Sequence, residues 1–211
     1  MDNVLESIIN NGEIRRAKLE VHFKEYKTAL NNLIDLIDLD ILEKIVSRFI
    51  QAHREGKTVY VCGNGGSAAT ASHFQVDFGF FVRYFTKKRM KFRSLTDQVP
   101  MITAIGNDHS YEDIFVDQMI DNFEKGDVLV AISASGNSMN VVKAVEYANK
   151  MGGTSIGLVG FKGGKLKEVS QICLYTPNPD KQYGPIEDLH MIIDHMMVSY
   201  LAKDEEFLSI Q

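Results

Sequence analysis

Tryptophan is absent from this chain of 211 residues, which has only two cysteines and four prolines. Both cysteines, Cys62 and Cys173, fall inside expected strands, so we expect buried, reduced thiols rather than a disulfide framework. No apolar run approaches the roughly 20 residues of a membrane-spanning helix. The first residues also lack the basic and then apolar order of a signal peptide. These features predict a cytoplasmic protein that does not span a membrane.

Excess positive charge is also lacking. The formal net charge is −5 and the isoelectric point is about 5.7, which argues against broad nucleic-acid binding. The one basic run, residues 87–93, is interpreted as a solvated loop. Hydrophobic residues make up 45% of the chain, enough for one compact domain with an additional helical arm.

Residues 58–67 are the most informative stretch, because a β-branched, apolar run ends there in the glycine-rich turn Cys-Gly-Asn-Gly-Gly-Ser. A strand that turns into a helix exposes backbone N–H groups, and the helix dipole adds positive potential. Gly65 allows a close backbone approach, while Asn64 and Ser67 offer side-chain hydrogen bonds. The pattern matches neither a nucleotide phosphate loop nor a complete dinucleotide fingerprint. A purely structural turn remains the alternative.

A second turn of the same kind follows the apolar run at 127–132. Ser133, Ser135 and Ser138 can each donate a hydroxyl proton to a phosphate oxygen. A serine-rich loop without lysine or a magnesium motif suits the phosphate monoester of a small molecule better than a nucleoside triphosphate. The alternative is that these serines serve solubility and that Ser138 caps the next helix.

Strands and helices are expected to alternate along the chain. The remaining predicted strands are 91–95, 154–159 and 171–175, and the predicted helices are 68–83, 99–107, 111–123, 139–151 and 186–202. Continuous apolar strands indicate a mostly parallel sheet covered on both faces. Ligands of such sheets bind beyond the carboxyl ends of the strands. The glycine and serine turns are therefore expected to share one site.

Residues 1–56 form a separate unit, an N-terminal helical arm with amphipathic patterns at 14–30 and 39–55. The arm cannot cover its apolar face alone, so we expect a homo-oligomer. The ligand-binding domain is assigned to 57–211.

The last predicted helix carries several ionisable residues. At 100° per residue, Glu187, His190 and Asp194 lie opposite its apolar side and are interpreted as a solvated face. His195 lies at the border of that face, where it can reach a cleft. On the helix at 68–83, His73 and Asp77 are one turn apart and point the same way.

Four parts of the sequence are informative together: the glycine turn, the serine turn, Gly-Asn-Asp at 106–108 with Asp-Ile-Phe at 113–115, and Ile-Glu-Asp-Leu-His at 186–190. They resemble the sugar isomerase (SIS) domain family, phosphoheptose isomerase branch. The likeness runs from about Thr58 to Leu201. It implies an α/β fold of the SIS type, with a parallel five-stranded sheet between helices. It also implies a homotetramer with sites at subunit contacts.

The resemblance implies an aldose–ketose isomerase that converts sedoheptulose 7-phosphate to D-glycero-D-manno-heptose 7-phosphate for bacterial surface polysaccharides. The three serines would then hold the phosphate, and Asn64, Gly65, Ser67, Asp97 and Glu187 would bind the substrate. Asp77 and His195 fall at the proton-transfer positions. The set of His73, Asp77, Glu187 and His195 falls where some members bind Zn²⁺, and two histidines with two carboxylates suit that ion.

Three positions depart from the family pattern, which has Glu at Asp77, Gln at Glu187 and an acid at Gly184. The shorter Asp77 side chain can move a base out of proton-transfer reach. A non-catalytic SIS module, which binds a sugar phosphate or a protein such as the replication initiator, is therefore the alternative function.

Overall fold

The protein is built on a five-stranded parallel sheet. A computed structural model describes the backbone of residues 2–86 and 88–210, and the side chains of these ranges from residue 12 onward. The strands are β1 (Thr58–Gly63), β2 (Lys91–Ser94), β3 (Val128–Ser133), β4 (Thr154–Val159) and β5 (Ile172–Tyr175), in the order β2-β1-β3-β4-β5. Val61 lies opposite Val130, and Val130 lies opposite Ile156. The predicted α/β fold with a parallel five-stranded sheet is confirmed.

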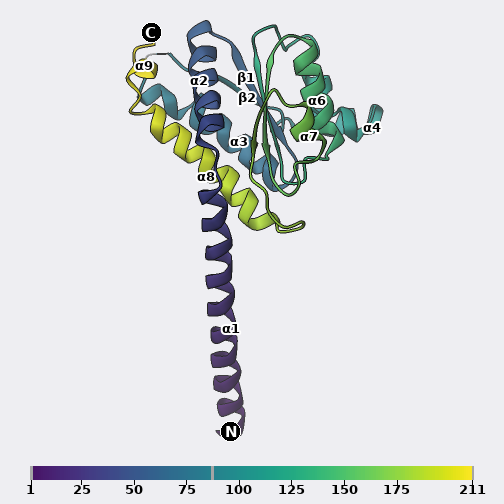
Figure 1. Ribbon diagram of the computed structural model, residues 1–211. Helices are drawn as coiled ribbons and strands as arrows, with labels where there is room; N and C mark the ends of the chain where they lie inside the picture. Colours follow the sequence, from purple (N-terminus) through teal and green to yellow (C-terminus); the bar gives the residue numbers. More distant parts are fainter. Residues whose placement is uncertain (1, 87, 211) are drawn as a thin grey trace.

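Helices cover both faces of the sheet (Figure 1). One face packs against α2 (Leu39–Glu55), α3 (Gly66–Gly79) and α8 (Tyr183–Leu201). The other packs against α4 (Val99–Asp108), α5 (Val116–Met119), α6 (Met139–Lys150) and α7 (Gly164–Val169). Successive strand residues alternate between the two cores, so Val61 enters the first and Cys62 the second. Both cysteines are free thiols, as predicted, and burial raises the pKa of each.

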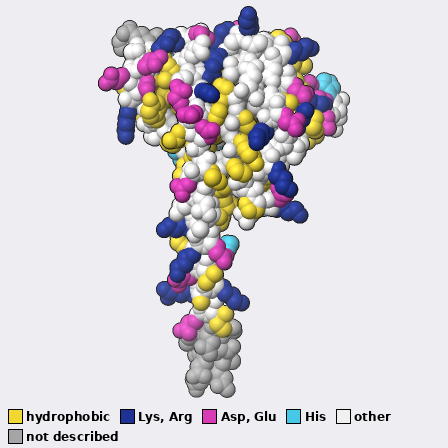
Figure 2. Space-filling model, viewed as in Figure 1, with side chains coloured by type: hydrophobic (Ala, Val, Ile, Leu, Met, Phe, Trp, Pro, Cys, Tyr) yellow, Lys and Arg dark blue, Asp and Glu magenta, His cyan; other side chains and the backbone are white. Residues whose placement is uncertain are grey.

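Of the predicted arm at 1–56, one long helix, α1 (Asp2–Asp35), projects from the domain (Figure 1), whereas α2 packs against the sheet, so only α1 forms an arm. The side chain of Leu33 is buried at the base of the arm, whereas Leu19 and Phe23 are each 65% exposed. Figure 2 shows such apolar side chains along the described part of the arm. A short connection follows α1. Asp38 is the N-cap of the next helix, because its side chain accepts hydrogen bonds from the N–H groups of Asp40 and Ile41, and α2 begins at residue 39. The apolar pattern at 14–30 thus belongs to a longer helix than predicted.

Several elements differ from the prediction. The expected helix at 111–123 is divided into a 3-10 turn (Tyr111–Asp113) and α5, and Ser110 caps the first piece by accepting from the N–H of Glu112. The region predicted as helix to residue 83 ends at Gly79 and continues as a 3-10 turn, Phe81–Tyr84. Two short helices, α7 and α9 (Glu205–Leu208), were not predicted. Short helices give too few turns for a periodic signal.

No helix in the described part of the chain combines the length and the apolar character needed to cross a bilayer.

Candidate active site

The glycine and serine turns meet in one pocket. They follow β1 and β3, which are neighbours in the sheet although β2 lies between them in the sequence. This is the switch point of the strand order, where parallel α/β sheets bind ligands. The cavity is about 150 Å³ and is lined by Asn64, Ser67, Ile132, Ser133, Ala134, Ser135, Ser138, Tyr183 and Glu187. The predicted convergence of the two turns is therefore observed.

The serine loop presents hydroxyl groups that are ready to donate. Ser133 Oγ accepts from the N–H of Gly136 at 3.0 Å, and Ser135 Oγ accepts from the N–H of Asn137 at 3.3 Å. Both hydroxyls act there as acceptors, so their protons can point to a ligand. Ser138 is the N-cap of α6 but makes no side-chain capping hydrogen bond. Ser138 thus takes the predicted N-cap position but leaves its hydroxyl without a capping bond, and the α6 N-terminus adds positive potential to a set of hydroxyls suited to an anion.

Asn64 joins the two turns from the inside. Its amide exchanges two hydrogen bonds of 2.9 Å with Asn140, and Tyr111 donates a third to its oxygen at 3.0 Å. Asn140 Oδ1 also accepts from the N–H of Val141. These bonds hold the glycine turn against α6 and engage one of the two Nδ2 hydrogens of Asn64, and its role in substrate binding stays a prediction.

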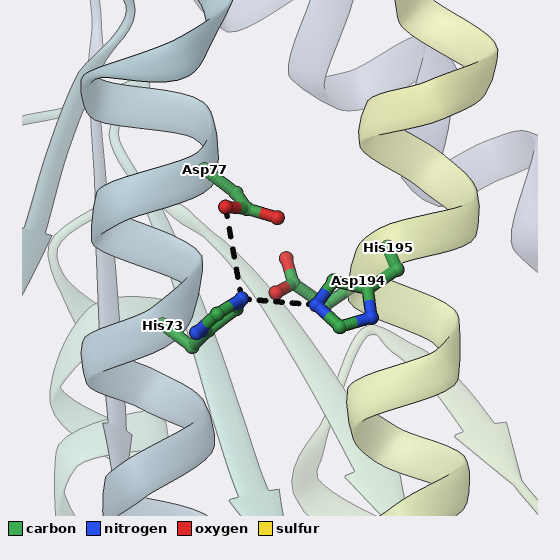
Figure 3. A group of neighbouring side chains, drawn as sticks. All are labelled: His73, Asp77, Asp194 and His195. Atoms are coloured by element: carbon green, nitrogen blue, oxygen red, sulfur yellow. Dashed lines mark hydrogen bonds and ion pairs between the residues drawn. The ribbon is translucent and has the colours of Figure 1, made fainter.

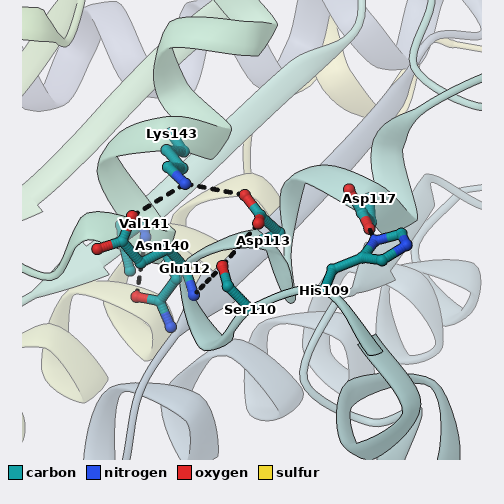
Figure 4. A network of polar contacts seen from close by, with 8 residues as sticks. All are labelled: His109, Ser110, Glu112, Asp113, Asp117, Asn140, Val141 and Lys143. Carbon is teal, nitrogen blue, oxygen red and sulfur yellow. Dashed lines mark hydrogen bonds and ion pairs between the residues drawn. The ribbon is translucent and has the colours of Figure 1, made fainter. Parts of the chain in front are cut away.

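Charged groups brace the start of α6 from outside (Figure 4). Lys143 forms ion pairs of 2.9 Å with both Glu112 and Asp113. Ser110 donates to Asp113, whose pKa is lowered by the hydrogen bonds from Ser110 and then Lys143. Through Asp113, the Asp-Ile-Phe segment thereby supports the helix that follows the serine loop.

Glu187 lies at the N-terminus of α3. A Cβ atom built on Gly66, the first residue of α3, would stand 2.2 Å from Glu187 Oε2. Glycine is therefore required at this position for the carboxylate to approach the backbone. Burial, and then the charge of Asp188, raise the pKa of Glu187. Glu187 is thus a pocket residue whose carboxylate accepts protons more readily than a solvated one.

A second group of functional side chains lies between α3 and α8 (Figure 3). His73 Nε2 is 2.9 Å from His195 Nε2 and 3.7 Å from Asp77 Oδ1. Asp194 completes the group, and one ligand atom from each of the four residues lies within 4.8 Å of the others. Two imidazoles and two carboxylates form a donor set that suits Zn²⁺. The predicted proximity of His73, Asp77 and His195 is observed.

Asp194 was not predicted as a site residue, and Glu187 does not join this cluster. Glu187 and His195 are eight residues apart on one helix, or about 12 Å along its axis. In this structure the carboxylate of Glu187 stands against Gly66, away from the group that His195 joins. The interpretation of His190 and Asp194 as solvated is wrong, since both are buried. Packing of α3 against α8 covers this face, and no single-helix pattern reports that contact.

Burial shifts the pKa values of Asp194 and His190. The pKa of Asp194 is raised to about 8, first by burial and second by the negative charge of Asp77. The pKa of His190 is lowered to about 4 by burial alone. In the metal-free protein near pH 7, Asp194 is therefore largely protonated and His190 is neutral.

Asp97 and Gly184 lie outside the pocket lining. The carboxylate of Asp97 accepts from Gln75 at 3.1 Å, from Ser94 at 3.2 Å and from Ser72, so it holds the end of β2 against α3. Its role in sugar binding stays a prediction. At Gly184, an added Cβ would stand 2.9 Å from the hydroxyl of Tyr26 on α1. The arm thus occupies the space that a side chain at 184 would need.

His190 is expected to make the metal-free protein sensitive to acid. The unfolded chain takes up a proton near pH 6.5, but the folded chain does so only near pH 4. At this site the unfolded state binds more protons between these values, so the contribution of His190 to the free energy of unfolding falls as pH drops, by roughly 3 kcal/mol in total. The raised pKa of Asp194 acts in the opposite direction in the wild type and the variant alike, so the difference between the two proteins reports His190. Urea titrations at pH 7 and pH 5 should show a smaller loss for His190→Met. His53, whose pKa burial also lowers, should retain part of the slope.

The matched control for this test is His22→Met, at an exposed position of α1. This variant should follow the wild type at both pH values. Parallel pH curves for His190→Met and the wild type would contradict the assignment.

Comparison with known proteins gives one consistent result. The family described as SIS domain matches residues 22–160. The phosphoheptose isomerase of Aneurinibacillus thermoaerophilus is 35% identical over 167 residues, 78% of this chain and 82% of that protein. That of Aliarcobacter butzleri is 39% identical over 164 residues, 77% of this chain and 85% of that protein. The solved phosphoheptose isomerase of Neisseria gonorrhoeae has a TM-score of 0.80 at 29% identity, covering 90% of this chain and 99% of that one.

Proposed function

The chain belongs to the SIS domain family, and from this membership we propose that it is a phosphoheptose isomerase. It is an aldose–ketose isomerase that converts sedoheptulose 7-phosphate to D-glycero-D-manno-heptose 7-phosphate. Relatives of that name match most of its length. The observation that carries the proposal is the pairing of an anion pocket with a proton-transfer cluster on the same two helices.

The spacing of these two parts suits a long sugar phosphate. Ser67 lines the pocket, and His73 in the cluster lies six residues further along α3. Six residues of helix span about 9 Å. Carbon–carbon bonds are about 1.5 Å long, so an extended seven-carbon sugar phosphate reaches on the order of 10 Å. A phosphate on the serine loop therefore allows the far end of a heptose chain to meet Asp77 and His195.

The chain's own residues account for the proton movements. Ser133, Ser135 and Ser138 hold the phosphate, and this binding fixes the reacting carbons near the cluster. Asp77 takes the proton from the hydroxyl-bearing carbon beside the carbonyl, while His195 gives a proton to the carbonyl oxygen. The former carbonyl carbon of the resulting enediol(ate) then receives the proton held by Asp77, and the other enediol hydroxyl gives its proton to His195, so both residues return to their starting states. Both hydrogens moved in the reaction are transferred as protons, so the sugar is neither oxidised nor reduced overall.

The cluster also fits a metal ion. His73, Asp77 and His195 are the residues that would hold Zn²⁺ in this proposal, and Asp77 can use one carboxylate oxygen for this and keep the other for the sugar. When bound, Zn²⁺ supplies a Lewis acid that stabilises negative charge on the carbonyl oxygen. The buried carboxylate of Asp194, which has no hydrogen-bond partner among the described residues, supports a cation at this place.

We extend the proposal to the assembly and the cellular role. The enzyme acts in the cytoplasm and feeds heptose synthesis for bacterial surface polysaccharides. It works as a homotetramer held together through α1. A helix that exposes Leu19 and Phe23 by 65% each needs a partner surface.

The double variant Leu19→Glu with Phe23→Glu should therefore lower the assembly state. Two charges placed on the apolar stripe of α1 remove its burial and repel their copies. Sedimentation velocity should show loss of the tetramer. The double variant Thr28→Glu with Asn31→Glu adds the same charge at exposed polar positions and should stay tetrameric. Equal sedimentation of both variants would contradict the role of the arm.

The reaction itself is tested by NMR in D₂O. Sedoheptulose 7-phosphate is supplied to protein prepared metal-free and to protein with added Zn²⁺. Formation of the aldose, with deuterium at the carbon beside its carbonyl, is the expected result. Binding of the sugar phosphate without conversion or exchange would instead support the alternative, a non-catalytic SIS module.

A further inference from the structure

Asp194 is a buried carboxylate without a protein partner. Its side chain is 0% exposed, and neither Oδ1 nor Oδ2 has a hydrogen-bond partner among the described residues. Removing a carboxylate from water without replacing its hydrogen bonds is strongly unfavourable. The described ion pairs include none to Asp194. A bound cation would compensate for this cost, because it would bind the carboxylate oxygens directly.

The residues around Asp194 are those that bind metals. Asp194 and His195 are neighbours on α8, yet Figure 3 shows both reaching towards His73 and Asp77 on the facing α3. Asp194 approaches from the buried side and His195 from the exposed side. Ligand atoms around a tetrahedral Zn²⁺ are about 3.3–3.5 Å apart, given bond lengths near 2.0–2.2 Å. A cluster within 4.8 Å reaches that geometry by small side-chain movements.

Glu187 has a different position. It lies about 12 Å from His195 along α8, and its carboxylate stands against Gly66 at the start of α3. It lines the pocket together with the three serines. Within one chain, Glu187 is thus placed to face the sugar phosphate rather than the cluster.

Building on the proposed zinc-dependent isomerase, we propose that Asp194 is the fourth metal ligand of this chain, in the place that the sequence assigns to Glu187. Glu187 then faces the substrate in the pocket. The ligand set is His73, Asp77, Asp194 and His195. Its two carboxylates balance the charge of a divalent cation, and its two imidazoles bind as neutral groups.

The experiment measures metal binding without any sugar. Metal-free wild type, Asp194→Asn and Glu187→Gln are titrated with Zn²⁺ against a chromophoric chelator, and with Co²⁺ while the visible absorption is recorded. We expect Asp194→Asn to weaken Zn²⁺ binding on the order of 100-fold or more, since even outer-shell partners of metal ligands are worth 10–100-fold. It should also change the Co²⁺ spectrum. Glu187→Gln, the matched control, should leave both unchanged.

A second variant separates metal binding from a structural role. Asp194→Leu replaces a buried, unpaired carboxylate with an apolar side chain, so the metal-free variant should melt at the wild-type temperature or above it. Added Zn²⁺ should raise the melting temperature of the wild type but not of this variant. A purely structural Asp194 predicts the opposite, a lower melting temperature and an intact response to Zn²⁺.

The outcomes separate this inference from the proposed function. Unchanged Zn²⁺ affinity and Co²⁺ spectrum in Asp194→Asn would overturn the inference, as would equal losses in Asp194→Asn and Glu187→Gln. A wild type that binds no metal would overturn it as well, whether or not the protein isomerises the sugar. A wild type that binds metal through Asp194 but converts no heptose phosphate would uphold the inference and refute the proposed function.

Discussion

Replacing Asp77 with asparagine should lower kcat for heptose phosphate isomerisation by about 1000-fold, because a general base contributes 10²- to 10⁴-fold. The amide keeps the shape of the side chain but cannot take a proton. Asp77 is buried and 3.7 Å from His73 Nε2, so bulk water is poorly placed to replace it. Steady-state kinetics by NMR, with Zn²⁺ content measured on the same samples, provide the test.

Asp77→Asn should bind the phosphate group of the substrate almost as well as the wild type does. Ser67, which lines the pocket together with the serine loop, is ten residues or about 15 Å along α3 from Asp77, so the affinity for inorganic phosphate should stay within a few-fold of the wild type. Asp117→Asn is the matched control, since Asp117 pairs with the exposed His109 at 2.5 Å, away from the cluster. Wild-type turnover by Asp77→Asn would remove Asp77 from the mechanism. Loss of phosphate binding would indicate a folding defect instead.

Replacing Gly136 with alanine should have the largest effect on stability. Gly136 has a φ of 67°, and a Cβ atom there would stand 1.9 Å from the carbonyl oxygen of Gly163. A side chain in this left-handed region costs about 1–2 kcal/mol, and the backbone contact adds to that cost. We expect a loss of about 3 kcal/mol or more. Gly136 also donates its N–H to Ser133 Oγ, so the phosphate affinity should fall at least about tenfold.

Gly106→Ala provides the comparison. Gly106 lies inside α4, has no positive φ, and its added Cβ would meet only Ile114 at 3.8 Å. Alanine should be neutral there or stabilise the helix by up to about 1 kcal/mol. Urea unfolding and calorimetric phosphate titration of both variants provide the test. Equal stability of the two variants would show that the serine loop tolerates a side chain at Gly136.

The pocket could be predicted from the sequence because the motifs that form it are each contiguous in the chain. An apolar run followed by glycine or serine is contiguous in the chain, and the rule that parallel strands end at one edge brings two such turns together. The same local logic placed His73 and Asp77 on one face of a helix. Element boundaries were less well predicted where the structure divides one predicted helix into two pieces, as within 111–123 and after Gly79.

The places of Asp194 and Glu187 in the site depend on contacts between helices, which the sequence pattern of one helix does not report. On an isolated helix both fall on the polar side, and a helical pattern gives no information about what covers that side. The packing of α3 against α8 buries Asp194 beside two histidines, while the eight residues between Glu187 and His195 separate them along the helix axis.

The sequence by itself determined the parallel α/β fold, the two turns that line the pocket and the shared face of His73 and Asp77, because each follows from periodicity, turn chemistry or spacing within one element. The family resemblance added His195 to that pair. Only the tertiary structure decided which carboxylate joins the histidines and which faces the pocket. That choice depends on the distance between two helices distant in sequence, and on the burial that their contact creates.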